Sequence, residues 1–385
     1  MMACMTLRSA PTSDALSAWV QQDFGVEITT LSPVEHGAEA AAQLWRGCGA
    51  DGASYAVKLS GAGTPAGLIL SAHLAEHGVA GVPRPLMGAQ GQPWSEREGR
   101  RLSVVPWVSE ARALEGEMSA AHWTSYGALL AKVHATTVTD ELATSLPRED
   151  HHHEQAASAT RALDRSLRLV AEESEAGRPA DPLVHALAQE WCAAGDRVLA
   201  LLERADYLGR ELQARKAPNV VVCHGDPHLG NVLIGQDDRV WLIDWYDSVL
   251  APRERDLIFI LGGVLAFAPV TPQQQAWFFD GYGATNLDPL RLAYYRCARA
   301  LEDLACPAAQ IVDLHRSTDR ERADALSIVR GVLSPTGLVT LAQAGRPPSC
   351  AEAAHTVAAP PVTGAYTAAD PLNRLVEGQI TCTGN

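Results

Sequence analysis

The residues most capable of chemistry lie in one short segment, residues 221–245, where Asp226 is followed by Asn231 and then by Asp244. One aspartate can orient and deprotonate an attacking hydroxyl group, while an amide oxygen and a second carboxylate are hard ligands of the kind that Mg²⁺ prefers. Each residue alone is common in turns and at strand ends. Their joint spacing is rarer, and it predicts magnesium-dependent phosphoryl transfer.

The local pattern predicts how these three residues come together. Residues 232–234 and 239–243 are rich in β-branched and aromatic side chains, and the sequence Gly-Gln-Asp-Asp joins them, which is typical of a β-hairpin with a four-residue loop. Symmetric pairing about this loop places Asn231 opposite Leu242. Asn231 and Asp244 should therefore emerge at the same end of the hairpin, which the loop carrying Asp226 also enters.

A lysine in the first part of the chain suits the same chemistry. Only three of the 31 basic residues are lysines, and one of them is Lys58, in a predicted strand over residues 54–59. A compact ammonium group can approach phosphate oxygens from a strand, where the planar fork of arginine does not replace it. The alternative is an ordinary surface lysine whose stem packs along the sheet.

Composition excludes several classes of protein. The chain has 385 residues, enough for two lobes or domains, and a formal net charge of −14 at pH 7, whereas nucleic-acid binding requires a basic face. The longest apolar run, residues 257–270, is too short to span a bilayer, and residues 1–14 lack the apolar region of a signal peptide. Eight cysteines without a C-x-x-C pair argue against a disulfide scaffold or a zinc ribbon. We expect a cytoplasmic protein that binds neither nucleic acid nor membrane.

The secondary-structure pattern changes once along the chain. The first part predicts a small, mainly antiparallel sheet, with helices at 13–24 and 65–77 and strands at 26–34, 43–46, 54–59, 82–86 and 102–108. The second part predicts helices at 120–134, 156–173, 184–213, 254–266, 273–279, 289–304 and 318–332. Five prolines after residue 345 and few large apolar side chains predict a poorly ordered tail. We expect an α+β fold with an N-lobe at 12–108, a helical C-lobe at 109–345 and a tail at 346–385.

The motifs His224-Gly225-Asp226, Asn231 and Ile243-Asp244-Trp245 resemble the catalytic loop and the metal-binding aspartate of the aminoglycoside phosphotransferase family, a small-molecule branch of the protein-kinase-like fold. The resemblance implies a two-lobed fold, ATP as the phosphoryl donor and Mg²⁺ as a cofactor. It implies Asp226 as the catalytic base, with Asn231 and Asp244 as magnesium ligands. His224 and Asp256 would support the catalytic loop.

The same resemblance assigns the nucleotide to the N-lobe. Lys58 would contact the α- and β-phosphates, and a turn at residues 36–41 would cover them. The backbone of a hinge at residues 104–108 would meet the adenine, with Val105, Trp107 and Val108 as the binding residues. One position departs from the family pattern, because the only acid in the predicted helix at 65–77 that is available to pair with Lys58 is Glu76, near the helix end.

Two later stretches, residues 250–257 and 294–303, resemble family members that phosphorylate the aminocyclitol antibiotic spectinomycin. The resemblance implies phosphorylation of a hydroxyl group on a cationic small molecule, which would inactivate the antibiotic and confer resistance. Four residues would form the acceptor site, with carboxylates for the cation and aromatic walls: Glu302, Asp303, Tyr294 and Tyr295.

Other interpretations stay open. Acids on a helix face are usually solvated, and adjacent aromatic residues usually divide between core and surface. For these four residues we weigh such ordinary positions equally with a role in the acceptor site. The same fold would serve a metabolic kinase for an amino alcohol or a sugar. A nucleotide-binding protein without turnover is a third interpretation, and the pattern does not determine the oligomeric state.

Overall fold

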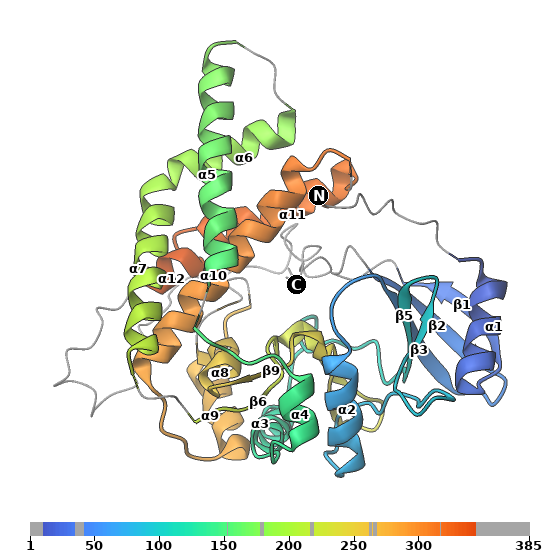
Figure 1. Cartoon of the computed structure of the whole chain (residues 1–385). Helices are drawn as coiled ribbons and strands as arrows, with labels where there is room; N and C mark the ends of the chain where they lie inside the picture. The colour runs from blue at the N-terminus through green and yellow to red at the C-terminus, as the bar shows by residue number, and fades with distance from the viewer. Residues whose placement is uncertain are drawn as a thin grey trace.

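The computed structural model describes residues 11–34, 42–151, 153–177, 181–215, 219–261, 264, 268–315 and 317–343. Figure 1 shows two lobes side by side, one containing a sheet and the other built mainly of helices. The α+β architecture expected from the sequence is confirmed. The expected phosphate-covering turn at 36–41 and the tail at 346–385 lie outside the described residues.

The N-lobe contains one five-stranded sheet. Its strands are β1 (Ile28–Pro33), β2 (Ala42–Gly49), β3 (Ser54–Ser60), β4 (Ser95–Arg97) and β5 (Arg100–Pro106). The order across the sheet is β1-β2-β3-β5-β4, and every neighbouring pair is antiparallel. Lys58 therefore lies on the central strand, between Leu44 of β2 and Ser103 of β5. A central strand is hydrogen-bonded to a neighbour on each edge, so the backbone position from which the Lys58 side chain extends is fixed.

Two helices complete the N-lobe, α1 (Ser13–Phe24) and α2 (Ala66–Glu76). α1 packs against the sheet through Leu16 and Val20. α2 lies between the sheet and the C-lobe (Figure 1). A Cβ atom at Gly67 would lie 2.2 Å from the carbonyl oxygen of Trp245, so only glycine lets α2 approach the segment that follows the catalytic hairpin.

The strand predicted at residues 82–86 is wrong, and β4 has no counterpart among the predicted strands. Pro83 and Pro85 have no N–H groups, so this segment cannot form a hydrogen-bonded ladder. It joins the sheet through the N–H of Leu86, which donates to the carbonyl oxygen of Val104 at 2.8 Å.

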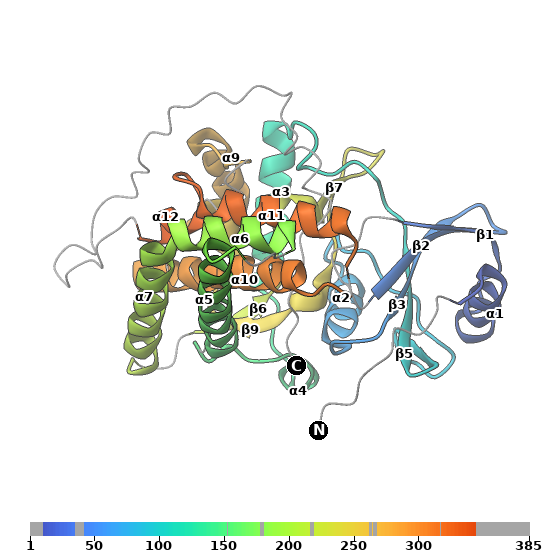
Figure 2. The ribbon, with the colours of Figure 1, turned by 90° about the horizontal axis from the view of Figure 1, so that it is seen from above.

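The C-lobe is built around two apolar cores. Its helices are α3 (Ala120–His134), α4 (Asp140–Ser145), α5 (Glu154–Glu175), α6 (Pro182–Ala193), α7 (Gly195–Gln213), α8 (Glu254–Leu261), α9 (Pro272–Tyr282), α10 (Pro289–Val312), α11 (Asp319–Leu333) and α12 (Leu338–Gln343). α5, α6, α7, α10, α11 and α12 surround one core, which Figure 2 shows from above, and α3 and α9 belong to the other. α8 contributes to both cores, so it joins them.

Three of the predicted helices differ from the structure. The one predicted over 254–266 ends at Leu261, as α8. The helix predicted over 184–213 is two helices, α6 and α7, which meet at Ala194 next to Gly195, a weak helix former. α10 continues beyond its predicted end at residue 304 and passes through Pro307. Burial of this helix in the core outweighs the local cost of the proline, since tertiary packing overrides helix propensity.

One stretch, Asp319–Gln343, is long and apolar enough to cross a membrane by length and composition alone. It comprises α11 and α12, and half of its most apolar window is buried inside the protein. Both helices contribute side chains to the core that contains α10. We therefore assign the stretch to the interior of the C-lobe.

Two short strand pairs carry the segment with the acidic residues: β6 (Val221–Cys223) with β9 (Val249–Ala251), and β7 (Val232–Ile234) with β8 (Val240–Leu242). The predicted hairpin β7–β8 is confirmed, but its register is wrong by one residue, because Val232 rather than Asn231 pairs with Leu242. The loop is one residue longer than expected. Asp238 in it takes a left-handed φ of 62°, which closes the longer turn before β8.

Candidate active site

Asp226 follows β6 on a loop that leaves it only 2% exposed. Its Oδ1 atom accepts a hydrogen bond from Nη1 of Arg299 at 2.8 Å, and its Oδ2 atom lies 3.5 Å from Nε2 of His228. Its backbone N–H donates to Nδ1 of His224 at 3.2 Å. The carboxylate is therefore enclosed by groups that favour negative charge.

These surroundings keep Asp226 ionised. Burial raises the pKa of this carboxyl group, but the charges of Arg299, His228 and His224 and the hydrogen bond from Arg299 outweigh burial and hold the pKa below its ordinary value. An ionised carboxylate can accept a proton from a hydroxyl group. Asp226 is thus competent as a general base at neutral pH.

Asn231 and Asp244 emerge at the same end of the hairpin, as predicted, because the N–H of Ile243 donates to the carbonyl oxygen of Asn231 at 3.0 Å. The Asn231 amide nitrogen donates to the backbone oxygen of Asp226 at 2.9 Å, which leaves its amide oxygen available to a ligand. Asp244 is exposed and takes a left-handed φ of 64°. Such strain in a residue other than glycine is concentrated at functional sites.

The donors at this end of the hairpin fit Mg²⁺. Asp247 is half-buried, and its pKa is raised to about 7 by desolvation and by the charges of Asp226 and Asp244. Three carboxyl groups therefore face one region, where a divalent cation would relieve their repulsion. The oxygens of Asn231 and Asp244 are hard ligands of the kind that Mg²⁺ prefers.

Asp256 connects α8 to the catalytic loop. Its Oδ2 atom accepts hydrogen bonds from the N–H of His224 at 2.8 Å and from Nε2 of His134 at 3.0 Å, and its Oδ1 atom accepts one from the N–H of Gly225 at 2.8 Å. Nε2 of His224 donates in turn to the carbonyl oxygen of Ile243. This chain of contacts joins the loop before Asp226 to the strand before Asp244, and the supporting roles of His224 and Asp256 stay a prediction.

Replacing the fully buried Asp256 by alanine should lower the free energy of unfolding by about 3–5 kcal/mol, because His134 and two backbone N–H groups lose their acceptor. Burial raises the pKa of Asp256. The hydrogen bonds and charges of His134, His224 and the N–H of Gly225 lower it by more, so the folded pKa lies below the ordinary value. The stabilisation is therefore present at neutral pH and is lost as pH falls through the folded pKa. Urea unfolding at neutral and acidic pH measures both effects. The same substitution at Asp280, exposed on α9, is the control.

Lys58 is directed at the segment that carries Asp244. Its ammonium nitrogen lies 3.6 Å from the ring centroid of Tyr246, two residues beyond Asp244, in a cation–π contact. Glu76, the only acid of α2, instead forms an exposed ion pair with Arg84 at 2.7 Å. Glu76, the candidate for the glutamate of the family pattern, therefore pairs with Arg84 rather than with Lys58.

The expected hinge joins the two lobes at the end of β5. Val105 pairs with Ala56 of β3, and the N–H of Trp107 donates to the carbonyl oxygen of Ser54 at 2.9 Å. The Trp107 ring is covered by the guanidinium group of Arg46 at 5.3 Å from its centroid. Val108 follows directly and is half-buried.

A small pocket opens beside Gly225, the residue before Asp226. It is lined by Gly225, Arg255, Ile258, Phe259, Tyr295, Ala298, Arg299 and Glu302. The structure thus brings Tyr295 and Glu302 to the catalytic loop. Asp303 lies behind the pocket, with its Oδ1 atom 2.7 Å from Nε of Arg299. Tyr294 is not brought there, because its ring packs against His151 and His153 in the C-lobe.

Arg299 and Arg255 are the charged pocket residues that the sequence analysis missed. Tyr295, Arg299 and Glu302 recur at the helical spacing of one face of α10, which is the only signal in the sequence that groups them. Arg255 is held by Glu149, whose carboxylate oxygen lies 3.1 Å from its Nη1 atom.

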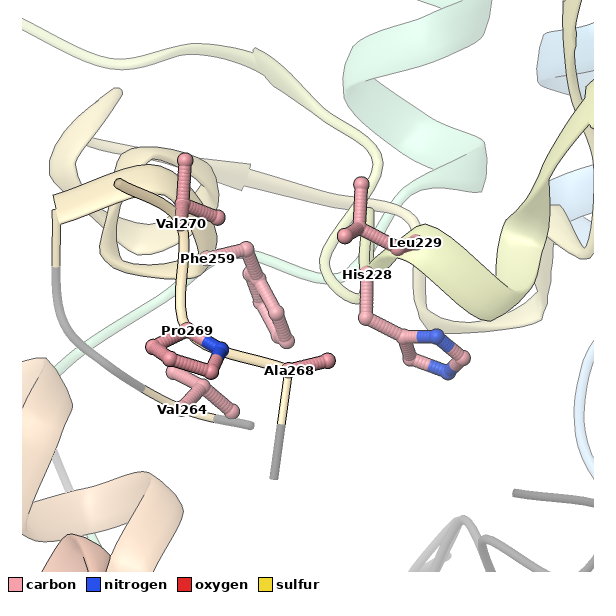
Figure 3. Close-up of a pocket in the computed structure, with 7 residues that line it drawn as sticks. All are labelled: His228, Leu229, Phe259, Val264, Ala268, Pro269 and Val270. Atoms are coloured by element: carbon pink, nitrogen blue, oxygen red, sulfur yellow. The ribbon is translucent and has the colours of Figure 1, made fainter. Parts of the chain in front are cut away.

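A second small pocket lies beside His228, two residues beyond Asp226. Figure 3 shows its lining: His228, Leu229, Phe259, Val264, Ala268, Pro269 and Val270. Apart from the imidazole the side chains are apolar, and Phe259 lines this pocket as well as the first one.

Comparison with known proteins identifies the fold and the family of this chain. Spectinomycin phosphotransferase APH(9)-Ia, solved in complex with ADP and spectinomycin, matches with a TM-score of 0.75 at 23% identity, over 87% of this chain and 99% of that one. Amicoumacin kinase hAmiN, solved with AMP-PNP, Ca²⁺ and Ami, matches with a TM-score of 0.56 at 16% identity, over 85% and 95%. These likenesses show the protein-kinase-like fold. Residues 30–301, from β1 through the catalytic loop into α10, match the sequence pattern of the phosphotransferase enzyme family, and the chain belongs to that family.

Proposed function

We propose that the protein transfers the γ-phosphoryl group of ATP to a hydroxyl group of a cationic small molecule, most specifically the aminocyclitol spectinomycin. The observation that carries the proposal is the ionised, buried Asp226 between the oxygen donors of the hairpin and the pocket lined by α10. Asn231 and Asp244 would hold Mg²⁺, which when bound neutralises charge on the phosphates. Lys58 would contact the phosphates, and Val105, Trp107 and Val108 would bind the adenine.

The chain's own residues define what happens at the acceptor. A hydroxyl group in the pocket beside Asp226 would hydrogen-bond to its carboxylate, which orients the oxygen and takes the proton as the bond to phosphorus forms. The support from Asp256 fixes the loop that carries Asp226. Because positioning accounts for much of the catalysis in phosphoryl transfer, a rigid loop is required for this step.

The charge around the pocket supports a cationic acceptor. Among the described residues, both arginines that line the pocket are already paired, Arg299 with Asp226 and Asp303 and Arg255 with Glu149, so Glu302 is the pocket acid that would meet a cation. The solved structure with spectinomycin in place makes this aminocyclitol the first acceptor to test. The cytoplasm, which supplies ATP and Mg²⁺, is the compartment that the proposal requires.

The direct test is to follow ADP release from Mg·ATP by the purified chain with one acceptor at a time. The panel contains spectinomycin, cationic aminoglycosides, amicoumacin and simple amino alcohols. Rapid release with spectinomycin alone supports the proposal in full. Rapid release with a different acceptor retains the phosphotransferase and refutes spectinomycin. ATP binding without release on any acceptor favours a nucleotide-binding protein without turnover.

Replacing Tyr295 by phenylalanine should raise the KM of the acceptor by about 3- to 10-fold and leave kcat nearly unchanged. Within the described part of the chain, the buried hydroxyl group of Tyr295 has no hydrogen-bond partner, and its side chain lines the pocket, so an acceptor would satisfy it. Steady-state kinetics with acceptor varied at saturating ATP measures the change. Tyr294→Phe removes a hydroxyl group outside the pocket and is the matched control. An unchanged KM in Tyr295→Phe would contradict the role.

A further inference from the structure

The nearest charged neighbour of Asp226 comes from α10, far away in the sequence. Arg299 donates from Nη1 to Oδ1 of Asp226 at 2.8 Å, while its Nε atom lies 2.7 Å from Oδ1 of Asp303, one helical turn further along α10. The side chain of Arg299 is only 11% exposed. One guanidinium group therefore bridges two carboxylates in an almost dry region, where such contacts are strong.

We propose that Arg299 is the positioning residue of this reaction: it holds Oδ1 of Asp226 and thereby presents Oδ2 to the acceptor hydroxyl group. The inference rests on the proposed function, since it gives Asp226 the part of the base. It assigns to Arg299 no contact with the phosphoryl group.

The geometry distinguishes the two carboxylate oxygens of Asp226. Oδ1 has a short, charge-assisted hydrogen bond to Arg299, whereas the separation of 3.5 Å between Oδ2 and Nε2 of His228 is longer than a normal hydrogen bond. Oδ2 is thus the oxygen with capacity for a further donor. The contact with Arg299 opposes rotation of the carboxylate away from this orientation, so one oxygen stays bound and the other stays open to the acceptor.

Arg299 is itself held in place. Asp303 engages its Nε atom from position i+4 of the same helix, and the ring of Phe259 lies 5.3 Å from its guanidinium carbon. The contact is an ion pair without hydrogen-bond geometry at Nε, so Asp303 restrains the planar guanidinium group through charge and close approach. Asp303 therefore orients Arg299, and Arg299 orients Asp226.

The opposite role is a block, in which Arg299 occupies the place of the acceptor and must leave before turnover. The two roles predict opposite signs. A positioning residue lowers kcat when it is removed, while a blocking residue raises kcat/KM of the acceptor when it is removed.

The test uses the full chain with Arg299→Ala, Arg299→Lys and Asp303→Asn, with the acceptor that the wild type turns over. Arg299→Ala should lower kcat about 100-fold, with the Kd of ATP unchanged. Guanidinium chloride, far below unfolding concentrations, should restore part of kcat in Arg299→Ala, and equal NaCl should not. Arg299→Lys keeps the charge but not the fork, so its loss should be about tenfold. Asp303→Asn should lower kcat less than Arg299→Ala does.

Arg322 provides the matched control. It is a buried arginine of α11 that pairs with two aspartates, Asp181 and Asp319, in the helical core. Arg322→Ala should lower the free energy of unfolding. Guanidinium chloride should not change its kcat, because this substitution leaves no space beside Asp226 for a guanidinium ion to occupy.

Two results would overturn the inference. The first is Arg299→Ala with unchanged kcat, or with raised kcat/KM of the acceptor. The second is a loss of kcat without guanidinium rescue, equal in size to that of Arg322→Ala, which would mark a merely structural role. If Arg299→Ala does not fold, full kcat in Asp303→Asn overturns the orienting chain. Absence of turnover by the wild type with every acceptor would instead refute the proposed function itself.

Discussion

Asp226→Asn should lower kcat by about 10²- to 10⁴-fold and leave the Kd of ATP within a factor of about two, because general-base catalysis supplies a rate factor of this size. The substitution keeps the shape of the side chain and removes its ability to take a proton. Arg299 and His228, which lie against the carboxylate, would then face a neutral amide. The acceptor hydroxyl group would still bind in the pocket, but it would have no base.

Single-turnover kinetics with Mg·ATP and acceptor measures the chemical step, and calorimetry measures ATP binding. Asp237→Asn, in the exposed loop of the hairpin, removes a carboxylate nearby in the sequence without touching the pocket. It should keep full activity. A kcat of Asp226→Asn within a factor of three of the wild type would exclude Asp226 as the base, as would an equal loss in the control.

The grouping of Asp226, Asn231 and Asp244 could be predicted because the three residues lie in one contiguous segment. A hairpin brings its own ends together, and its strands and turn are visible in local composition. The register could not be predicted, because it depends on Asp238 adopting a left-handed conformation. Aspartate enters that region only occasionally, and sequence alone does not show where.

The contacts of α10 could be predicted from the sequence only in part. The helical period places Tyr295, Arg299 and Glu302 on one face, but which face meets the catalytic loop depends on how α8 and α10 pack. Tyr294, one position away, does not line the pocket, although both tyrosines belong to the same C-lobe core. A pair such as Arg299 with Asp226, 73 residues apart in the chain, leaves no trace in local composition.

The surroundings of Lys58, too, could be predicted from the sequence only in part. Its strand and its direction toward the hairpin follow from the alternating pattern of β3 and from the fold. The family resemblance implies a glutamate partner in α2, yet Glu76 lies at the exposed end of that helix and pairs with Arg84. The contact with Tyr246 depends on the approach of α2 and the sheet to the C-lobe, which no local pattern encodes.

Asp244→Ala should raise the Mg²⁺ concentration needed for half-maximal rate by at least about 100-fold, since loss of even an outer-shell partner of a metal ligand costs about 10- to 100-fold in affinity. Asp244 is the exposed carboxylate of the cluster, whereas Asp247 is half-buried with a pKa raised to about 7 and Asp226 is engaged by Arg299. It is therefore the carboxylate best able to give both its charge and its oxygens to a cation. Alanine also relieves the repulsion that raises the pKa of Asp247, so the variant should remain folded.

Rates measured across a Mg²⁺ titration at saturating ATP give the shift, and electron paramagnetic resonance with Mn²⁺ and nucleotide gives metal affinity without turnover. Asp238→Ala changes an exposed aspartate of the same hairpin that contacts His122, and it should leave both curves in place. If Asp244→Ala lowered kcat at every Mg²⁺ concentration while the Mn²⁺ affinity stayed at the wild-type value, Asp244 would act on the acceptor or the loop. Only a shift of the titration itself ties this strained position to the metal, and it does so independently of which acceptor the pocket binds.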